Sequence, residues 1–237
     1  MEFEHPLQEA TLVRRYKRFL ADVETASGES LTLHTPNTGS MHGCAEPGSR
    51  VWYWDSGNPK RKLPHTWELT ERADGTRIGV NTSRSNHLVR EAIENGTIVE
   101  LAGQGVVRPE VRLGESRIDF AIEGGEQPCY VEVKNVTLAE GRVALFPDAV
   151  TRRGARHLDE LRQVVEAGGR GVILFCVQRD DVDEVRPADA IDPAYGEALR
   201  RALAAGVEAL AYGADISLAG IELRHRLPVV CPEPAAA

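Results

Sequence analysis

The stretch that decides the fold is RIDFAIEGGEQPCYVEVK (117–134), in which two runs of mostly apolar residues flank a Gly-rich turn and predict a β-hairpin. Strand side chains alternate between faces, so Glu132 and Lys134 are expected on one face and the valines beside them on the other. On the first strand, Asp119 is expected to meet Glu132 across the hairpin. The hairpin would therefore carry two carboxylates and a lysine among apolar neighbours.

Two carboxylates in apolar strands need a compensating partner. At about 4 Å they repel each other by about 4 kcal/mol when the effective dielectric constant is near 20. A divalent cation, an ammonium group or a shared proton would relieve this repulsion. Lys134 is one neighbour, and Mg²⁺ or Mn²⁺ is a natural guest for hard oxygen ligands. The alternative is an exposed hairpin whose charges face solvent, because an Asp followed by Glu-x-Lys also occurs by chance.

The following segments extend the hairpin into a crossover unit. FPDAVTRRGARHLDELRQVVEAGG (146–169) is typical of a helix, with Pro147 and Asp148 opening it. Its buried stripe is expected to include Ala149, Val150, Leu158, Leu161, Val164 and Val165. GVILFCVQRDD (171–181) indicates a strand covered on both faces, with Gln178 near the carboxylates where that strand emerges.

The pattern changes near residue 82, which predicts two domains, 1–82 and 83–237. Short strands between Gly, Pro, Asn and Ser clusters suggest an all-β unit first, and alternating helical and strand patterns suggest a mixed α/β unit after it. NTGSMHG (37–43) is expected to close the β unit rather than to cradle a phosphate, because it lacks the Gly-Lys-Ser/Thr of a P-loop.

The four scattered cysteines form no C-x-x-C pair, which favours reduced thiols in a cytoplasmic protein over a zinc site. No segment has the length of a membrane span, and the first residues lack the layout of a signal peptide. The net charge of −8 argues against a nucleic-acid partner, but residues 1–80 carry ten Lys and Arg against eleven Asp and Glu. A phosphate backbone senses the local patch more than the total, since the Debye length is about 8 Å.

Three basic groups are candidates for contact with nucleic acid. They are Arg14, Arg15, Lys17 and Arg18 around Tyr16; Lys60, Arg61 and Lys62 after the aromatic run at 52–54; and Arg152, Arg153 and Arg156 on the expected helix. Bases stack on aromatic rings while cations follow phosphates, although a solvated strand edge explains either of the first two groups alone. RRYKRF (14–19) does not alternate cleanly, which predicts a bulge or bend. His157 is expected to face either substrate or water.

The hairpin, helix and buried strand resemble the PD-(D/E)XK nuclease superfamily, and the chain as a whole resembles the sugar fermentation stimulation protein A family. The resemblance covers almost the whole chain. It is carried by RRYKRFLADV (14–23), HTPNTGSMHGC (34–44), NPKRKLPHTWEL (58–69), GVNTSRSNHLVREAI (79–93), SRIDF (116–120), YVEVKNVTL (130–138), FPDAVTRRGARHL (146–158) and LFCVQR (174–179).

This resemblance implies an N-terminal OB-type β-barrel, a nuclease-like mixed α/β domain and DNA as the partner. It implies that Asp119 and Glu132 hold one Mg²⁺ or Mn²⁺, joined by the carbonyl of Val133 and by Glu91 or Glu94 from the preceding helix. Lys134 would orient the attacking water or stabilise the developing charge, and Gln178 would position that water. Homodimers are common among such nucleases, although no segment of the sequence identifies an interface.

Two functions remain open at this point. The first is a metal-dependent nuclease that binds single- or double-stranded DNA largely without regard to sequence. The second is a non-catalytic DNA-binding regulator of sugar (maltose-type) metabolism genes. An intact Asp, Glu and Lys set favours metal chemistry, because a pure binder gains nothing from acidic groups that face phosphates. The sequence has no helix-turn-helix signature for specific regulation.

Overall fold

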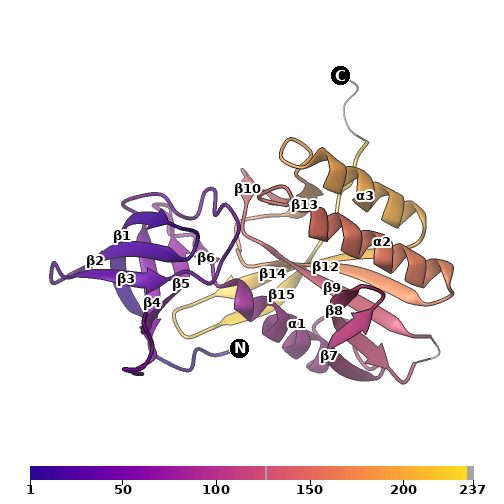
Figure 1. Ribbon diagram of the computed structural model, residues 1–237, viewed down its shortest axis with the longest axis horizontal. Helices are drawn as coiled ribbons and strands as arrows, with labels where there is room; N and C mark the ends of the chain where they lie inside the picture. Colours follow the sequence, from indigo (N-terminus) through magenta and orange to yellow (C-terminus); the bar gives the residue numbers. More distant parts are fainter. Residues whose placement is uncertain (126, 234–237) are drawn as a thin grey trace.

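Six strands in the first third of the chain form one sheet in the order β3-β2-β1-β4-β5-β6, and a further pairing of β3 with β5 closes a barrel (Figure 1). The computed structural model describes residues 1–125 and 127–233. The barrel strands are β1 (Gln8–Tyr16), β2 (Leu20–Thr25), β3 (Ser30–His34), β4 (Arg50–Asp55), β5 (His65–Glu71) and β6 (Arg77–Gly79). The N-terminal OB-type barrel that the sequence predicts is confirmed.

Strand β1 shows how the sequence produces the barrel. Ala10 and Leu12 are buried in the barrel core while Thr11 between them is exposed, as the alternation of a half-buried strand requires. The pairing of β1 with β2 shifts register between Leu12 and Arg14, which is the irregularity that RRYKRF predicts. Lys17 and Arg18 then adopt positive φ angles of 49° and 64° and turn the chain into β2.

The second domain is a six-stranded mixed sheet in the order β15-β14-β12-β9-β8-β7 with helices on both faces. Its elements are a 3₁₀ turn, η1 (Thr82–Arg84), then α1 (Ser85–Glu94), β7 (Val106–Leu113), β8 (Ser116–Glu123), β9 (Cys129–Val136), β10 (Ala139–Glu140), β11 (Val143–Phe146), α2 (Arg152–Glu166), β12 (Arg170–Val177), β13 (Glu184–Pro187), α3 (Pro193–Ala204), β14 (Glu208–Ile216) and β15 (Ile221–Leu227). Strands β10, β11 and β13 form a small separate sheet.

The predicted crossover is present: β9 and β12 are parallel neighbours, and α2 lies on the sheet between them in the chain (Figure 1). Helix α1 packs on one face of the sheet with Val131, Val133 and Cys176. Helices α2 and α3 pack on the other face with Ile173, Phe175 and Val177. The two faces of the sheet therefore have separate apolar cores.

Helix α2 begins later than the sequence predicts. It starts at Arg152, with Thr151 as the cap accepting from the Gly154 N–H at 3.0 Å, and Val150 before it is 71% exposed. Asp148 does not open the helix, because its carboxylate accepts from the Met41 N–H and the Ser40 hydroxyl of the barrel, each at 3.2 Å. The segment before α2 thus links the two domains.

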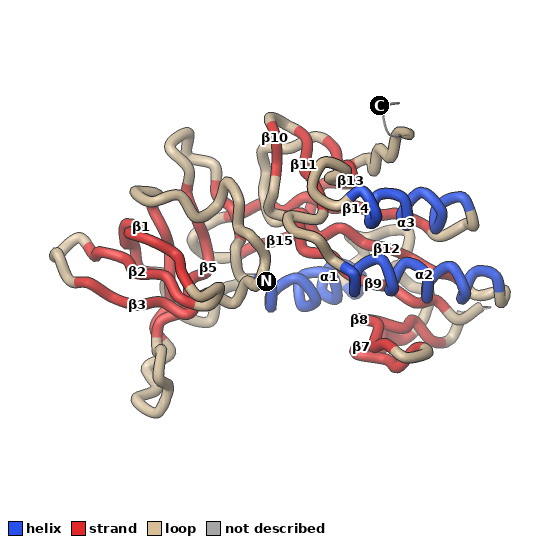
Figure 2. The backbone as a smooth tube through the Cα atoms, turned by 45° about the horizontal axis from the view of Figure 1, so that its top comes forward, coloured by secondary structure: helices blue, strands red, loops and turns tan. Residues whose placement is uncertain are grey.

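The domains also meet where β6 reaches the end of β12. The Gly79 N–H donates to the Gln178 carbonyl at 2.9 Å, and Ile78 forms an isolated bridge with Arg179. Trp52 and Leu69 of the barrel pack against the apolar core on the α1 side of the large sheet. Figure 2 shows the barrel beside the end of this sheet.

Three of the four cysteines are buried, and all four are free. In the described ranges 1–125 and 127–233, no helix has both the length and the apolar character needed to cross a membrane.

Candidate active site

Strands β8 and β9 separate at the point where Asp119 faces Glu132. The last paired residues are Phe120 and Val131, so Asp119 is the next residue along β8 and Glu132 its counterpart on β9. The Asp119 carboxylate replaces the backbone carbonyl that would accept from β9 if the two strands stayed paired: its Oδ2 accepts from the Val133 N–H at 2.8 Å. The amide of Asn86 at the start of α1 donates to Oδ1 at 2.8 Å. Asp119 is therefore fixed at the fork between two strands.

Glu132 is buried on the α2 side of the sheet, and its two oxygens have different surroundings. Oε1 accepts from the Lys134 ammonium at 2.7 Å and from Nδ1 of His157. Oε2 is fully buried and has no hydrogen-bond partner among the described residues. A buried carboxylate oxygen without a partner is costly and therefore marks a place where a ligand is expected.

The pKa shifts of the two carboxyl groups have opposite directions. Burial, followed by the charge of Glu132, raises the pKa of Asp119, and the bonds from Val133 and Asn86 only partly offset this. Burial alone would also raise the pKa of Glu132, but the hydrogen bond from His157 and the charge of Lys134 outweigh it and lower that pKa. Glu132 is thus stabilised as an anion, while ionised Asp119 remains under-compensated.

His157 belongs to this site, although its sequence context allows it to face either substrate or water. It is 2% exposed, and Nε2 lies 3.2 Å from the Arg153 Nε that donates to it. The signal that identifies it is spacing, because His157, Leu161 and Val164 follow the i, i+4, i+7 pattern of the buried face of α2.

Glu91 does not join the pair. Its Oε2 lies 2.8 Å from the terminal ammonium of Met1, and its side chain is 40% exposed. Glu94, the alternative ligand, pairs with Arg90 at 2.7 Å. Within residues 1–125 and 127–233, no three His, Cys, Asp or Glu side chains gather in a way that could hold a metal ion. The expected third carboxylate from α1 is therefore not part of this arrangement.

Gln178 lies on the other face of the sheet, which contradicts its expected place beside the attacking water. It follows Cys176 by two residues and so shares the face that packs against α1. Its side chain is fully buried, and its amide donates to Asn135 Oδ1 at 2.5 Å and to the Ser85 hydroxyl at 3.3 Å. Gln178 ties β12 to β9 and α1, while Glu132 faces α2.

The arginines at the start of α2 lie next to the site and are exposed. Arg153 donates through Nε to His157. Arg152 and Arg156 form no ion pair or side-chain hydrogen bond with any described residue. This edge of α2 therefore presents cationic groups that are free for an outside partner.

The basic residues of β1 and its turn have mixed roles. Arg14 forms an ion pair with Asp22 at 2.8 Å and lies over the Tyr16 ring, 4.9 Å from its centroid. Arg15 is turned inward, where its guanidinium donates to the carbonyls of Arg18, Asn37, Gly39 and Ser40. Lys17 and Arg18 are exposed at the tip of the turn. Only part of this predicted patch is therefore both exposed and unpaired within the described chain.

The aromatic run 52–54 divides among three environments. Trp52 packs against the core of the second domain, and Tyr53 is buried in the barrel. Trp54 stacks on His5, with ring centroids 5.2 Å apart, and the Arg61 guanidinium lies 5.5 Å from the centroid of the Trp54 ring. Trp54 is therefore the member of the run that lies beside the basic loop, where Lys60 and Lys62 are exposed.

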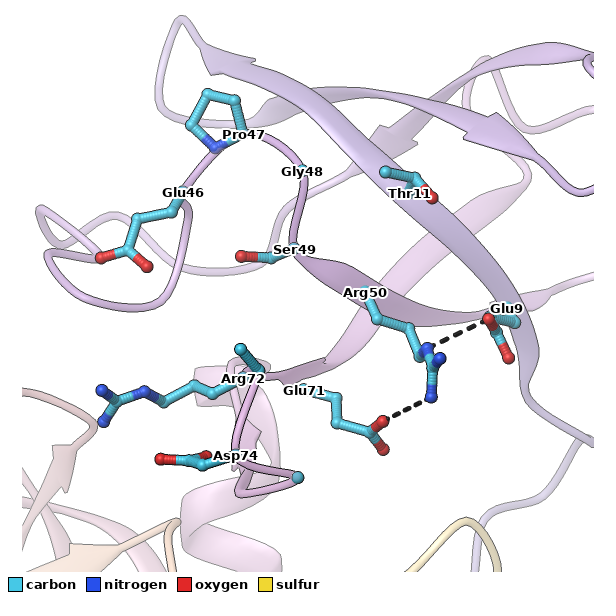
Figure 3. Close-up of a pocket in the computed structure, with 12 residues that line it drawn as sticks. Glu9, Thr11, Glu46, Pro47, Gly48, Ser49, Arg50, Glu71, Arg72 and Asp74 are labelled. Carbon is cyan, nitrogen blue, oxygen red and sulfur yellow. Dashed lines mark hydrogen bonds and ion pairs between the residues drawn. The ribbon is translucent and has the colours of Figure 1, made fainter.

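A cavity of about 750 Å³ lies elsewhere on the barrel and contains none of the candidate residues. Two of its carboxylates share one arginine: Arg50 contacts Glu9 at 3.1 Å and Glu71 at 2.7 Å (Figure 3). A second cavity of about 350 Å³ lies between the barrel loop at 37–39 and the segment 145–151 that leads into α2. Size alone therefore does not locate the carboxylate site.

Comparisons with known proteins cover both domains. Residues 13–80 match the SfsA N-terminal OB domain, and residues 83–220 match the Sugar fermentation stimulation protein RE domain. A sugar fermentation stimulation protein homolog from Pelobacter propionicus is 62% identical over 226 residues, covering 95% of this chain and 98% of the relative. A homolog of the same description from Pseudomonas aeruginosa is 56% identical over 233 residues, 97% and 99% of the two chains.

A solved structure, described as Pyrococcus furiosus SfsA in complex with Ca²⁺, has the same architecture. It superposes with a TM-score of 0.88 at 31% sequence identity and covers 97% of this chain and 98% of that chain. The two domain matches, the curated relatives and this structure agree along nearly the full length. The chain belongs to the SfsA family of sugar fermentation stimulation proteins.

Proposed function

We propose that this protein binds DNA largely without regard to sequence and hydrolyses a phosphodiester bond with a divalent cation held by Asp119 and Glu132. The observation that carries the proposal is that Glu132 Oε2 is buried without a hydrogen-bond partner in the described part of the chain, at the fork where Asp119 is also held. Lys134 lies beside the pair and completes the Asp, Glu and Lys set.

The residues at the fork suit a hard cation. Glu132 Oε2 and an Asp119 oxygen are anionic, and the Val133 carbonyl is the third candidate ligand. Mg²⁺ and Mn²⁺ accept such a small set of oxygens because water fills the remaining positions. Burial raises the pKa of Asp119 and repulsion from Glu132 adds to it, and a cation would relieve that repulsion. The Ca²⁺ complex of the Pyrococcus furiosus relative supports a divalent cation in this family.

The protein groups have separable roles in the proposed reaction. When bound, Mg²⁺ or Mn²⁺ supplies Lewis-acid polarisation of a phosphodiester oxygen and lowers the pKa of water. The Lys134 ammonium, 11% exposed at its side chain, orients the attacking water or stabilises the charge that develops on the phosphorane. Burial of the carboxylates strengthens both effects, since water screens the charges less.

The DNA surface is proposed from cationic groups that form no ion pair within the described chain. Arg152 and Arg156 lie beside the site on α2, and Arg153 reaches it through His157. On the barrel, the exposed groups are Lys17, Arg18, Lys60 and Lys62, with Trp54 and Arg61 as a stacking pair. Contacts of this kind address phosphates and base faces, which supports the proposal of binding without sequence preference.

The test is cleavage of labelled single-stranded and duplex DNA with Mg²⁺ or Mn²⁺, comparing wild type with Lys134→Ala. Arg117→Ala is the matched control, because it removes a positive charge from β8 that pairs with Glu110 at 3.0 Å and not with the site carboxylates. We expect metal-dependent cutting that Lys134→Ala loses and Arg117→Ala keeps. Cutting by Lys134→Ala at the wild-type rate would contradict the assigned site.

A second candidate, a non-catalytic DNA-binding regulator of sugar metabolism genes, is favoured by two observations. Both oxygens of Asp119 already accept hydrogen bonds, and Glu91 faces Met1 instead of the site. DNA binding without any metal-dependent cutting would support this candidate. A salt titration then separates its forms, because sequence-independent binding weakens equally for all DNA sequences as salt rises.

A further inference from the structure

His157 is the one buried histidine that contacts a candidate cation ligand within the described chain. Helix α2 places it over β9, where Nδ1 faces Glu132 Oε1. The Lys134 ammonium reaches the same oxygen at 2.7 Å and lies 3.5 Å from His157 Nδ1. Two nitrogens therefore converge on Oε1 of Glu132, and Oε2 has no hydrogen-bond partner among the residues that the structure describes.

The partners of the ring fix where its proton resides. The Arg153 Nε–H can only donate, so His157 Nε2 must accept and carries no hydrogen. The proton is then on Nδ1, which donates to Glu132 Oε1. In the opposite tautomer, Nδ1 would place a lone pair against the carboxylate, and Nε2–H would face the Arg153 donor. The contacts on both sides of the ring thus select one tautomer.

The chemistry of Lys134 is consistent with this assignment. An ammonium group only donates, and Nδ1–H also donates, so the 3.5 Å contact between them holds no hydrogen bond. Both groups instead share Glu132 Oε1 as their acceptor. Two donors on one oxygen resist rotation of the carboxylate, which is how outer-shell groups orient metal ligands.

We infer that His157 is a positioning residue for the cation site: its Nδ1–H holds Glu132 Oε1 and leaves Oε2 facing the divalent cation. This inference rests on the cation site of the proposed function but is independent of whether DNA is cut. Arg153 has an indirect part, since its Nε fixes the tautomer from the exposed side of α2.

The test measures Mn²⁺ affinity by calorimetry for wild type, His157→Asn and His157→Leu. The Asn amide nitrogen takes the place of Nδ1 and keeps the donor, whereas Leu fills the space without one. We expect His157→Asn to bind Mn²⁺ nearly as wild type does and His157→Leu to bind roughly 10- to 100-fold more weakly. A second readout is the ¹⁵N spectrum of the wild-type imidazole, which should show Nδ1 protonated and Nε2 free.

Leu161→Val is the matched control, since it loosens the same buried face of α2 one turn further on without touching Glu132. It should lower Tm and leave the Mn²⁺ affinity unchanged. The inference is overturned if His157→Leu binds Mn²⁺ as wild type does, if His157→Asn loses as much affinity as His157→Leu, or if the spectrum shows Nε2 protonated. The spectrum decides the tautomer even if the Leu variant does not fold.

The same samples keep this inference separate from the proposed function. If Mn²⁺ binding depends on the His157 donor but no DNA is cut, the positioning role stands and the nuclease proposal fails. If DNA is cut and Mn²⁺ affinity is indifferent to His157, the nuclease proposal stands and the positioning role fails. Absence of Mn²⁺ binding by the wild-type protein overturns the positioning role.

Discussion

The buried carboxylates of the fork and the carboxylate of Asp22 in the barrel are compensated to very different degrees. In the barrel, Asp22 accepts from Arg14, Tyr16 and Thr32, and these bonds overcome burial to lower its pKa. At the fork, Asp119 has a raised pKa, and Oε2 of Glu132 has no hydrogen-bond partner among residues 1–125 and 127–233. The carboxylate of Asp22 is thus compensated by its own neighbours, whereas the fork leaves carboxylate charge for a ligand, as is typical of a functional site.

The arginines show the same contrast for a reason that lies in the backbone. The loop at 37–40 has carbonyls outside any strand ladder, and Arg15 satisfies three of them together with that of Arg18. Helix α2 satisfies its own carbonyls through its i to i−4 bonds. Arg152 and Arg156 therefore have no carbonyls of the described chain to bind. Basic residues clustered in the sequence can thus stabilise a loop when they lie beside it, or remain unpaired when they lie on a helix.

The largest effect that separates the two regions is on cleavage. Asp119→Asn removes the anionic ligand but keeps the shape of the side chain, so single-turnover cutting of DNA should fall by about 10²–10³-fold or more, the scale of losing one preorganised electrostatic group. The matched variant is Asp22→Asn, which changes a carboxylate that also accepts hydrogen bonds from its neighbours but lies in the barrel. Its cutting rate should stay within a few-fold of wild type, and equal losses in both variants would contradict the contrast.

Much of this fold follows from the sequence because its local patterns agree with one another. The alternation in 117–134 and the apolar run at 171–181 predict β8, β9 and β12, and the parallel pairing of β9 with β12 follows from the helix between them. The predicted start of α2 is wrong because Asp148 bonds to the barrel loop, a tertiary interaction that no local pattern contains. Gly39 allows that interaction, since a Cβ there would collide with the Asp148 carboxylate.

The site is less predictable than the fold, for similar reasons. Spacing alone brings Asp119, Glu132 and Lys134 together, because one hairpin register determines all three. The predicted place of Gln178 is wrong because the face of a strand depends on residue parity, and Gln178 has the parity of Cys176 on the α1 side. His157 can be placed from the sequence only if the buried face of α2 is allowed to include a polar residue among its apolar ones.

The second prediction concerns stability and tests the hydrogen bonds that the Arg15 guanidinium donates to the loop carbonyls. Arg15→Met should lower the free energy of unfolding by about 2–3 kcal/mol, because the loop carbonyls lose a charged donor. Denaturant unfolding measures this decrease. Arg14→Met is the control on the same strand, since its partner Asp22 keeps two other donors and the Arg14 side chain is 67% exposed. A larger decrease for Arg14→Met would reverse the assigned roles.

The third prediction concerns DNA affinity and tests Arg152 and Arg156, which form no ion pair or side-chain hydrogen bond within the described chain. Replacing both Arg152 and Arg156 with Ser should reduce the slope of log affinity against log salt by about 0.9 for each duplex phosphate that the protein no longer neutralises. Unfolding should change little, because neither side chain bonds within the described chain. The comparison variant is Arg14→Ser, whose charge is already paired, and its salt slope should stay close to that of wild type. An unchanged slope in the α2 double variant would remove this helix from the DNA surface.

The smallest effect is a pair of pH dependences with opposite signs, measured as Tm in the presence of a chelator. The folded-state pKa of Asp119 is raised above its ordinary value of 3.8, so the folded protein holds this proton more tightly than the unfolded chain. Its ionisation therefore costs stability as pH rises from 3.8 through the folded pKa. At pH 7 Asp119→Asn should raise Tm slightly, since its amide can still accept from the Val133 N–H and donate to a reoriented Asn86.

Asp22 supplies the opposite sign. Its folded-state pKa lies below 3.8, so its ionised form stabilises the barrel above that pH, and this contribution is lost as pH falls through the folded pKa. Asp22→Asn should therefore lower Tm relative to wild type at pH 7, and Asp119→Asn should raise it. Both differences in Tm should shrink in acid, because the carboxyl group of the wild type is then protonated. A decrease in Tm at pH 7 for both variants would mean that the fork, like the barrel, compensates its own charge, and the argument for an external cation would lose its electrostatic basis.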